Sequence, residues 1–145
     1  MSEDQLHAVA RQQLPQGGQL IRVLAAVIRD GGRYLVCLRP AHKRHGGCWE
    51  FPGGKLESGE TLLEAARREL VEELGIEVLS AGEPVFTRQD PGSSFLIEFV
   101  EVSINGNPVA REHDEIRWAT PAELEGLHLA PSDKAFSVSI LRSPA

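Results

Sequence analysis

Cysteine is scarce in this chain of 145 residues, which contains only Cys37 and Cys48. The two lack the spacing of a zinc site, and a domain of this size does not need a disulfide to be stable. We therefore expect both side chains to be reduced thiols.

An excess of positive charge is also missing. The 15 Lys and Arg residues are outnumbered by 21 Asp and Glu residues, and the net charge is -6. Proteins that bind nucleic-acid polymers depend on clustered Lys and Arg, so such a polymer is not expected as the main partner. A small polyphosphate that arrives with its own metal ion does not require a basic surface.

Long apolar runs are absent as well. The sequence has no basic region followed by an apolar run at its start, and no stretch reaches the length of a membrane span. We expect no membrane association, a cytoplasmic location, and either a monomer or a homodimer.

Composition points to one globular domain, because 41% of the residues are hydrophobic and 25% are charged. Residues 1–19 are polar and end in Pro15 and the Gly17-Gly18 pair, so we expect an N-terminal leader there. Residues 20–145 are expected to form a single domain, and they contain no internal repeat and no low-complexity tract.

Apolar and β-branched runs alternate with turn residues and helical patterns along that domain. The result is an α/β prediction, in which helices cover both faces of a mixed sheet. The last helix is predicted to have Ser132 as its cap. Strands are expected at 20–28, 34–39, from 49 into a glycine loop, at 77–88, 94–104 and 115–119, and helices at 62–74, 121–125 and 132–141.

The helix over 62–74 is the best specified element. Thr61 and Glu64 have the spacing of a capping box, and Gly75 suits the left-handed residue that ends a helix. Its apolar positions recur at helical spacing, which predicts a stripe that packs on a sheet. These positions are Leu63, Ala66, Leu70 and Leu74.

Three glutamates share one face of this helix. Glu69, Glu72 and Glu73 stand at i, i+3 and i+4, where carboxylates repel one another unless a cation lies among them. No Cys or His lies among these glutamates. Their carboxylate oxygens are hard ligands, which select Mg²⁺ or Mn²⁺ over zinc. The arrangement indicates metal-assisted chemistry on a phosphate ester or anhydride, although charged helix faces are more often only solvated.

Residues 54–76 match the pattern G-x5-E-x7-R-E-U-x-E-E-x-G-U, in which U is a bulky aliphatic residue. This is the Nudix box, and the chain resembles a Nudix hydrolase. Within the family it most resembles the MutT-like nucleoside triphosphate pyrophosphohydrolases, because W-E-F-P-G-G-K runs into the box and A-P-S-D opens the last helix. The resemblance covers about 20–141 and implies the Nudix-type α/β/α sandwich with a mixed β-sheet. The matched positions are Gly54, Glu60, Arg68, Glu69, Leu70, Glu72, Glu73, Gly75 and Ile76.

The resemblance also implies a metal site. The carbonyl of Gly53 and the box glutamates are the expected ligands, with Arg68 orienting Glu69 through a salt bridge. Glu112 is expected to complete the site, although it could be an ordinary loop carboxylate and the nearby Asp114 and Glu115 leave the register open. The expected ligand and base candidates are Glu69, Glu72, Glu73 and Glu112, and the sequence does not decide which of them is the general base.

Three further residues are candidates for substrate binding. Arg39 matches a phosphate-contacting arginine of the branch, with a surface arginine as the alternative. Phe51 is placed to stack on a base or to fill the core. Asp133 matches the position that reads the base edge, where an ionised carboxylate accepts hydrogen bonds from cytosine N4 or from guanine N1 and N2. It could instead be a helix-start acid favoured by the helix dipole.

The predicted reaction is Mg²⁺-dependent hydrolysis of a nucleoside triphosphate, such as 8-oxo-dGTP or CTP or dCTP, to the monophosphate and pyrophosphate. ADP-ribose, or another nucleoside diphosphate derivative, is an alternative suggested by the position of Pro91, which a Pro-Gly turn also explains. The tyrosine that marks the dinucleoside polyphosphate branch is missing after the box, since the only tyrosine is Tyr34. A non-catalytic nucleotide-binding Nudix domain usually lacks box carboxylates, and here all are present.

Overall fold

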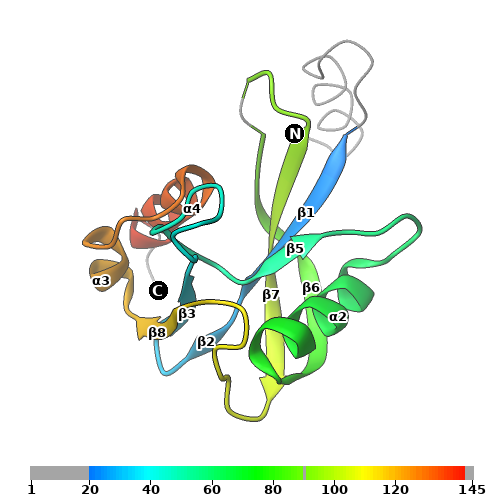
Figure 1. The fold of residues 1–145 in the computed structure, drawn as a ribbon, viewed down its shortest axis with the longest axis horizontal. Coiled ribbons are helices and arrows are strands. Elements are labelled where there is room, and N and C mark those ends of the chain that lie inside the picture. Colours follow the sequence, from blue (N-terminus) through cyan, green and yellow to red (C-terminus); the bar gives the residue numbers. More distant parts are fainter. Residues whose placement is uncertain (1–19, 90, 143–145) are drawn as a thin grey trace.

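The computed structural model describes residues 20–89 and 91–142, so the leader predicted for residues 1–19 lies outside the described residues. In the described part, the strands form two four-stranded sheets (Figure 1). The first has the order β5-β1-β7-β6 and is mixed, because β1 and β7 run parallel while the other pairs are antiparallel. Its strands are β1 (Ile21–Val27), β5 (Gly53–Lys55), β6 (Glu77–Arg88) and β7 (Phe95–Asn105).

The second sheet is antiparallel and is built around β3, which pairs with β2, β4 and β8. The sequence predicted one mixed sheet, whereas the strands are divided between the antiparallel sheet and the mixed sheet. The strands of the antiparallel sheet are β2 (Arg29–Asp30), β3 (Arg33–Leu38), β4 (Trp49–Glu50) and β8 (Glu115–Ala119). The helices of the described residues are α2 (Leu62–Leu74), α3 (Pro121–Glu125) and α4 (Pro131–Arg142).

Helices cover both faces of the mixed sheet, as an α/β/α sandwich requires. Successive side chains of β1 point to opposite faces. Leu24 and Ala26 join a core cluster with α2, while Ala25 and Val27 join a second cluster that includes Phe136 of α4. The predicted fold class is therefore confirmed.

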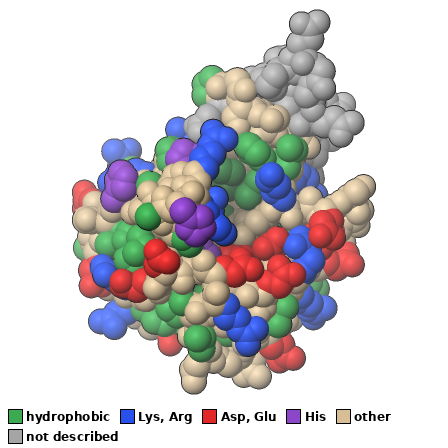
Figure 2. Space-filling model, in the orientation of Figure 1, with side chains coloured by type: hydrophobic (Ala, Val, Ile, Leu, Met, Phe, Trp, Pro, Cys, Tyr) green, Lys and Arg blue, Asp and Glu red, His purple; other side chains and the backbone are tan. Residues whose placement is uncertain are grey.

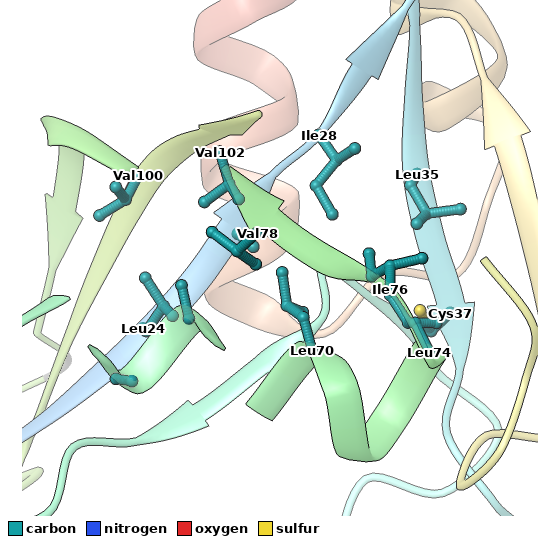
Figure 3. Close-up of a cluster of buried hydrophobic side chains, with 13 residues drawn as sticks. Leu24, Ile28, Leu35, Cys37, Leu70, Leu74, Ile76, Val78, Val100 and Val102 are labelled. Atoms are coloured by element: carbon teal, nitrogen blue, oxygen red, sulfur yellow. The ribbon is translucent and has the colours of Figure 1, made fainter. Parts of the chain in front are cut away.

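Helix α2 begins and ends where the sequence predicts. Thr61 and Glu64 form both hydrogen bonds of the capping box, and Gly75 ends the helix with φ 66°. Leu70 and Leu74 are fully buried and point toward the strands, as Figure 3 shows. This packing leaves the flank of the helix that carries the glutamates at the border between core and solvent.

The prediction for the start of the last helix is wrong by one residue. Helix α4 begins at Pro131, and the N–H of Lys134 donates to the carbonyl of Ala130 at 2.8 Å. Proline suits the first helical position because the N–H that it lacks would have no intrahelical partner there. Ser132 is thus a buried residue of the first turn and not the cap.

The segment before α4 is tied to β4. The N–H of Trp49 donates to the carbonyl of His128 at 2.8 Å, and the N–H of Ala130 donates to the carbonyl of Trp49 at 3.0 Å. These bonds bring the first turn of α4 beside the glycine loop that follows β4. Residues about 80 positions apart therefore meet at one place.

Two further expectations concern the chain as a whole. Cys37 and Cys48 are both buried and free, as predicted. In the part of the chain that the structure describes, no helix has both the length and the apolar character needed to cross a membrane.

Candidate active site

A cleft of about 790 Å³ lies where the glycine loop, the loop after β3 and the first turn of α4 meet. Its lining includes Arg39, Gly53, Gly54 and Asp133. In Figure 2, acidic side chains gather in a band beside a hollow of the surface, with Lys, Arg and His side chains on the other side of the hollow. The cleft therefore presents a negative border and a positive border to one bound molecule.

Arg68 organises the acidic border. It donates to both carboxylate oxygens of Glu60 at 2.8 Å, to the Lys55 carbonyl at 3.0 Å and to Glu69 at 2.7 Å. The hydrogen bond from Arg68 is the main cause that lowers the pKa of Glu60 to about 2. Arg68 thus fastens the loop before α2 to the helix and fixes the direction of the Glu69 carboxylate, which is the contact expected from the resemblance.

The two glycines of the loop are required by close approaches. A Cβ on Gly54 would lie 2.6 Å from the carboxyl carbon of Glu69. A Cβ on Gly53 would collide with the backbone carbonyl of Leu24, and Gly53 also has φ 150°, which disfavours any residue with a side chain. The loop backbone can therefore lie directly against the Glu69 carboxylate.

Glu73 is the most buried acid of the site, with its side chain 5% exposed. Burial raises its pKa, and the charges of Glu69 and Glu112 add to this effect, while the backbone N–H of Gly53 opposes it. Among the described residues its Oε2 atom has no hydrogen-bond partner. A buried carboxylate that is repelled by the charges of two other carboxylates, and that has an oxygen available, is suited to bind a cation.

Glu112 reaches this cluster through the loop before β8. The N–H of Val109 donates to the carbonyl of Leu74, and that of Arg111 to the carbonyl of Glu73, both at 3.0 Å. The loop therefore runs along the end of α2 and carries Glu112 into the range of Glu73. Glu115, which left the register open in the sequence, lies on β8 and pairs with Arg117 at 3.1 Å.

Mg²⁺ fits this arrangement of donors. In proteins it is commonly held by a few carboxylates together with phosphate oxygens and water, so a complete cage of protein ligands is not needed. Glu72 and Glu112 are exposed, and in residues 20–89 and 91–142 no three His, Cys, Asp or Glu side chains surround one point. The acids form an open rim, which a bound phosphate could complete.

Asp133 lines the cleft from the first turn of α4. Its carboxylate is buried and accepts a hydrogen bond from the N–H of Phe51 at 2.9 Å. Burial is the main cause that raises its pKa to about 7. The fold therefore keeps an acidic side chain at the cleft although burial removes much of its hydration, which is typical of functional sites.

The ring of Phe51 lies in the core, which is the second of the two alternatives that the sequence left open. The residue is 4% exposed, and its ring contacts Tyr34, Phe99 and Phe136 edge to face with centroid distances of 5.2 to 6.4 Å. Three aromatic neighbours leave no open face for a nucleobase. Phe51 contributes to the site through its backbone N–H, which orients Asp133.

Arg39 lines the cleft at the end of β3. Its side chain donates to the carbonyl of Arg44, and its Nη1 atom lies 3.5 Å from each carboxylate oxygen of Glu50. Glu50 also contacts His113 at 2.9 Å. Neither Glu50 nor His113 was singled out from the sequence, although one directly precedes Phe51 and the other directly follows Glu112. His42 and His45, in the loop after β3, are exposed.

The family model described as "NUDIX domain" matches residues 18–141, and the chain belongs to this family. Its box carboxylates are all present, and it is a Nudix hydrolase of the MutT-like kind. Similar proteins include the CTP pyrophosphohydrolase of Escherichia coli, 39% identical over 79% of this chain and 87% of that protein. The putative 8-oxo-dGTP diphosphatase 2 of Mycobacterium tuberculosis is 36% identical over 83% of this chain and 88% of its own length.

Solved structures show the same likeness. The E. coli ORF135 protein has a TM-score of 0.74 and 35% identity, covering 88% of this chain and 92% of that one. A structure from a study of MutT from Aliivibrio salmonicida and Vibrio cholerae has a TM-score of 0.70 and 31% identity, covering 85% and 98% of the two chains.

Proposed function

We propose that the protein hydrolyses a nucleoside triphosphate to the monophosphate and pyrophosphate, with Mg²⁺ as its cofactor. The observation that carries the proposal is the position of Asp133, a buried carboxylate that lines the same cleft as the glycine loop, in which Gly54 lies against Glu69 of the acidic rim. One end of the cleft suits a base edge and the other suits a phosphate chain with its metal. The similarity to a CTP pyrophosphohydrolase and a putative 8-oxo-dGTP diphosphatase supports the same class of substrate.

The resemblance and the contacts described above support the following roles for the residues. Glu69, Glu72, Glu73 and Glu112, with the Gly53 carbonyl, would hold the ion, which when bound neutralises charge on the transferring and leaving oxygens. Arg68 keeps Glu69 in place, and Arg39 faces the phosphates from the other border of the cleft. A water molecule attacks phosphorus in line, and one of the glutamates accepts its proton.

Asp133 restricts the base. Above a pH of about 7, where its carboxylate is ionised, Asp133 only accepts hydrogen bonds, so it pairs with the N4 amino group of cytosine or with N1–H and N2–H of guanine. Adenine presents a comparable amino donor at N6, and it is the similarity to a CTP pyrophosphohydrolase and a putative 8-oxo-dGTP diphosphatase that favours cytosine and guanine over it. CTP, dCTP and 8-oxo-dGTP are therefore the substrates that we place first.

Release of pyrophosphate from a panel of nucleotides in the presence of Mg²⁺ tests the proposal. CTP, dCTP, dGTP, 8-oxo-dGTP and ADP-ribose would be compared at equal concentration, and the triphosphates should be hydrolysed faster than ADP-ribose. In parallel, Asp133→Ala should lose on the order of 1 to 3 kcal/mol of discrimination between triphosphates while metal-dependent hydrolysis continues. Preferential cleavage of ADP-ribose, or an unchanged ranking in the variant, would contradict the proposal.

The compartment and the assembly remain predictions. Two buried free thiols suit a reducing compartment, which supports the cytoplasm as the place of action. The predicted assembly is a monomer or a homodimer.

A further inference from the structure

His113 lies between Glu50, which lines the cleft, and Glu73 of the acidic cluster. It lies just before β8, at the junction of the antiparallel sheet with α2, and its side chain is 5% exposed. Its Nε2 atom is 2.9 Å from a carboxylate oxygen of Glu50 and 3.8 Å from one of Glu73. A single ring nitrogen thus stands between an acid of the strand layer and an acid of the helix.

The chemistry of the pair fixes the direction of the hydrogen bond. A carboxylate offers only acceptors, so Nε2 must carry the hydrogen and donate it to Glu50. The other ring nitrogen, Nδ1, is buried and has no hydrogen-bond partner among the described residues. Within residues 20–89 and 91–142, the bond from Nε2 to Glu50 is the one short polar contact of the His113 ring.

Glu50 in turn faces Arg39. It lies on β4 opposite Cys37 of β3, and both of its carboxylate oxygens are 3.5 Å from Nη1 of Arg39. Without a donor on its other side, the carboxylate would be free to rotate away from the guanidinium. A charge-assisted bond at 2.9 Å removes that freedom.

We propose that His113 is a positioning residue that holds Glu50 against Arg39, and thereby aims the Arg39 guanidinium at the substrate phosphates. This inference rests on the proposed function, because it requires that Arg39 contacts a bound triphosphate. It assigns to His113 no contact with substrate and no transfer of a proton.

Two substitutions, His113→Gln and His113→Asn, distinguish the roles of the two ring nitrogens. The amide nitrogen of glutamine can take the place of Nε2, whereas that of asparagine takes the place of Nδ1, which has no partner in the described part of the chain. We expect His113→Asn to raise the KM for the preferred triphosphate about tenfold, with a smaller fall in kcat, and His113→Gln to restore KM to within about threefold of the parent. Equal KM values for the two variants, or a fall in kcat alone, would overturn the proposal.

A measurement on the metal-free, unliganded protein provides a second readout. In a ¹H–¹⁵N spectrum tuned to histidine ring nitrogens, His113 should be protonated at Nε2, and Glu50→Gln should shift that signal. A ring protonated only at Nδ1 cannot donate to Glu50 and would overturn the proposal, whether or not any variant folds. The spectrum needs no substrate, whereas failure of the proposed function would appear as absence of pyrophosphate release by the parent protein.

Discussion

The substitution Asp133→Asn is predicted to stabilise the protein at alkaline pH while leaving it no more stable at acidic pH. In the folded protein, burial raises the pKa of Asp133 from 3.8 to about 7. A raised pKa means that the folded state binds the proton more tightly than the unfolded state does. The stability that this proton contributes is fully present below pH 3.8 and is lost as the pH rises through about 7.

The size of the effect follows from the shift. Because the pKa rises from 3.8 to about 7, and each tenfold change in proton affinity is worth roughly 1.4 kcal/mol, the ionised carboxylate costs at most about 4 kcal/mol above pH 7. Asparagine keeps an oxygen that can accept from the N–H of Phe51, but its amide adds two buried donors, which cost about 1 to 3 kcal/mol if they find no partner. The net gain at pH 8 should therefore be on the order of 1 to 3 kcal/mol.

Urea unfolding between pH 5 and pH 8, without divalent cations or nucleotide, measures this difference. Glu73, whose pKa is also raised, is present in both proteins, so the difference between them reports Asp133 alone. Asp114→Asn is the matched control, since Asp114 is exposed and its loss should change stability little at either pH. If Asp133→Asn and the parent lose stability equally over this range, the carboxylate is not desolvated as argued.

Three further predictions concern the acidic rim. Glu73→Gln should lower turnover by at least about 10² with the fold intact, and near-normal activity of a folded variant would remove Glu73 from the metal site. Glu112→Gln should lower turnover strongly while Glu115→Gln should have little effect, and circular dichroism would confirm that both are folded; the reverse order would show that the wrong carboxylate was chosen. Gly54→Ala would place a Cβ 2.6 Å from the Glu69 carboxyl carbon, so that the carboxylate must move. Turnover should then fall about tenfold or more with a change in Tm of only a few degrees, and a large loss of Tm would show that the loop itself had been disrupted.

Local signals allowed α2 to be predicted to the residue. The capping box at Thr61 and the left-handed residue at Gly75 act through bonds that span three or four positions, so the sequence contains both partners within one window. The same holds for the Arg68 network, since Glu60 and Glu69 lie within eight residues of it. Such features depend little on the rest of the fold.

The division of the strands between two sheets has no comparable local signal. The pairing of β3 with β8 joins Tyr34 to Ala119, and nothing in either segment specifies the other. Strand patterns state which residues are buried, but many pairings can satisfy the same pattern. For the same reason, the ring of Phe51 could not be assigned to the core until Phe99 and Phe136 were seen around it.

The contacts that complete the site are separated even further in sequence, by 63 residues for Glu50 and His113 and by 82 for Phe51 and Asp133. The direction of the Glu50 side chain could nevertheless have been inferred from the sequence of β4 once the core was known. Successive side chains of an extended segment point to opposite faces, so the packing of Phe51 among the aromatic rings turns Glu50 away from them. The opposite side is where α2 and its buried Glu73 lie, and an acid directed there requires a donor to hold it. His113 is that donor. The burial of the apolar Phe51 therefore explains why its neighbour Glu50 faces His113.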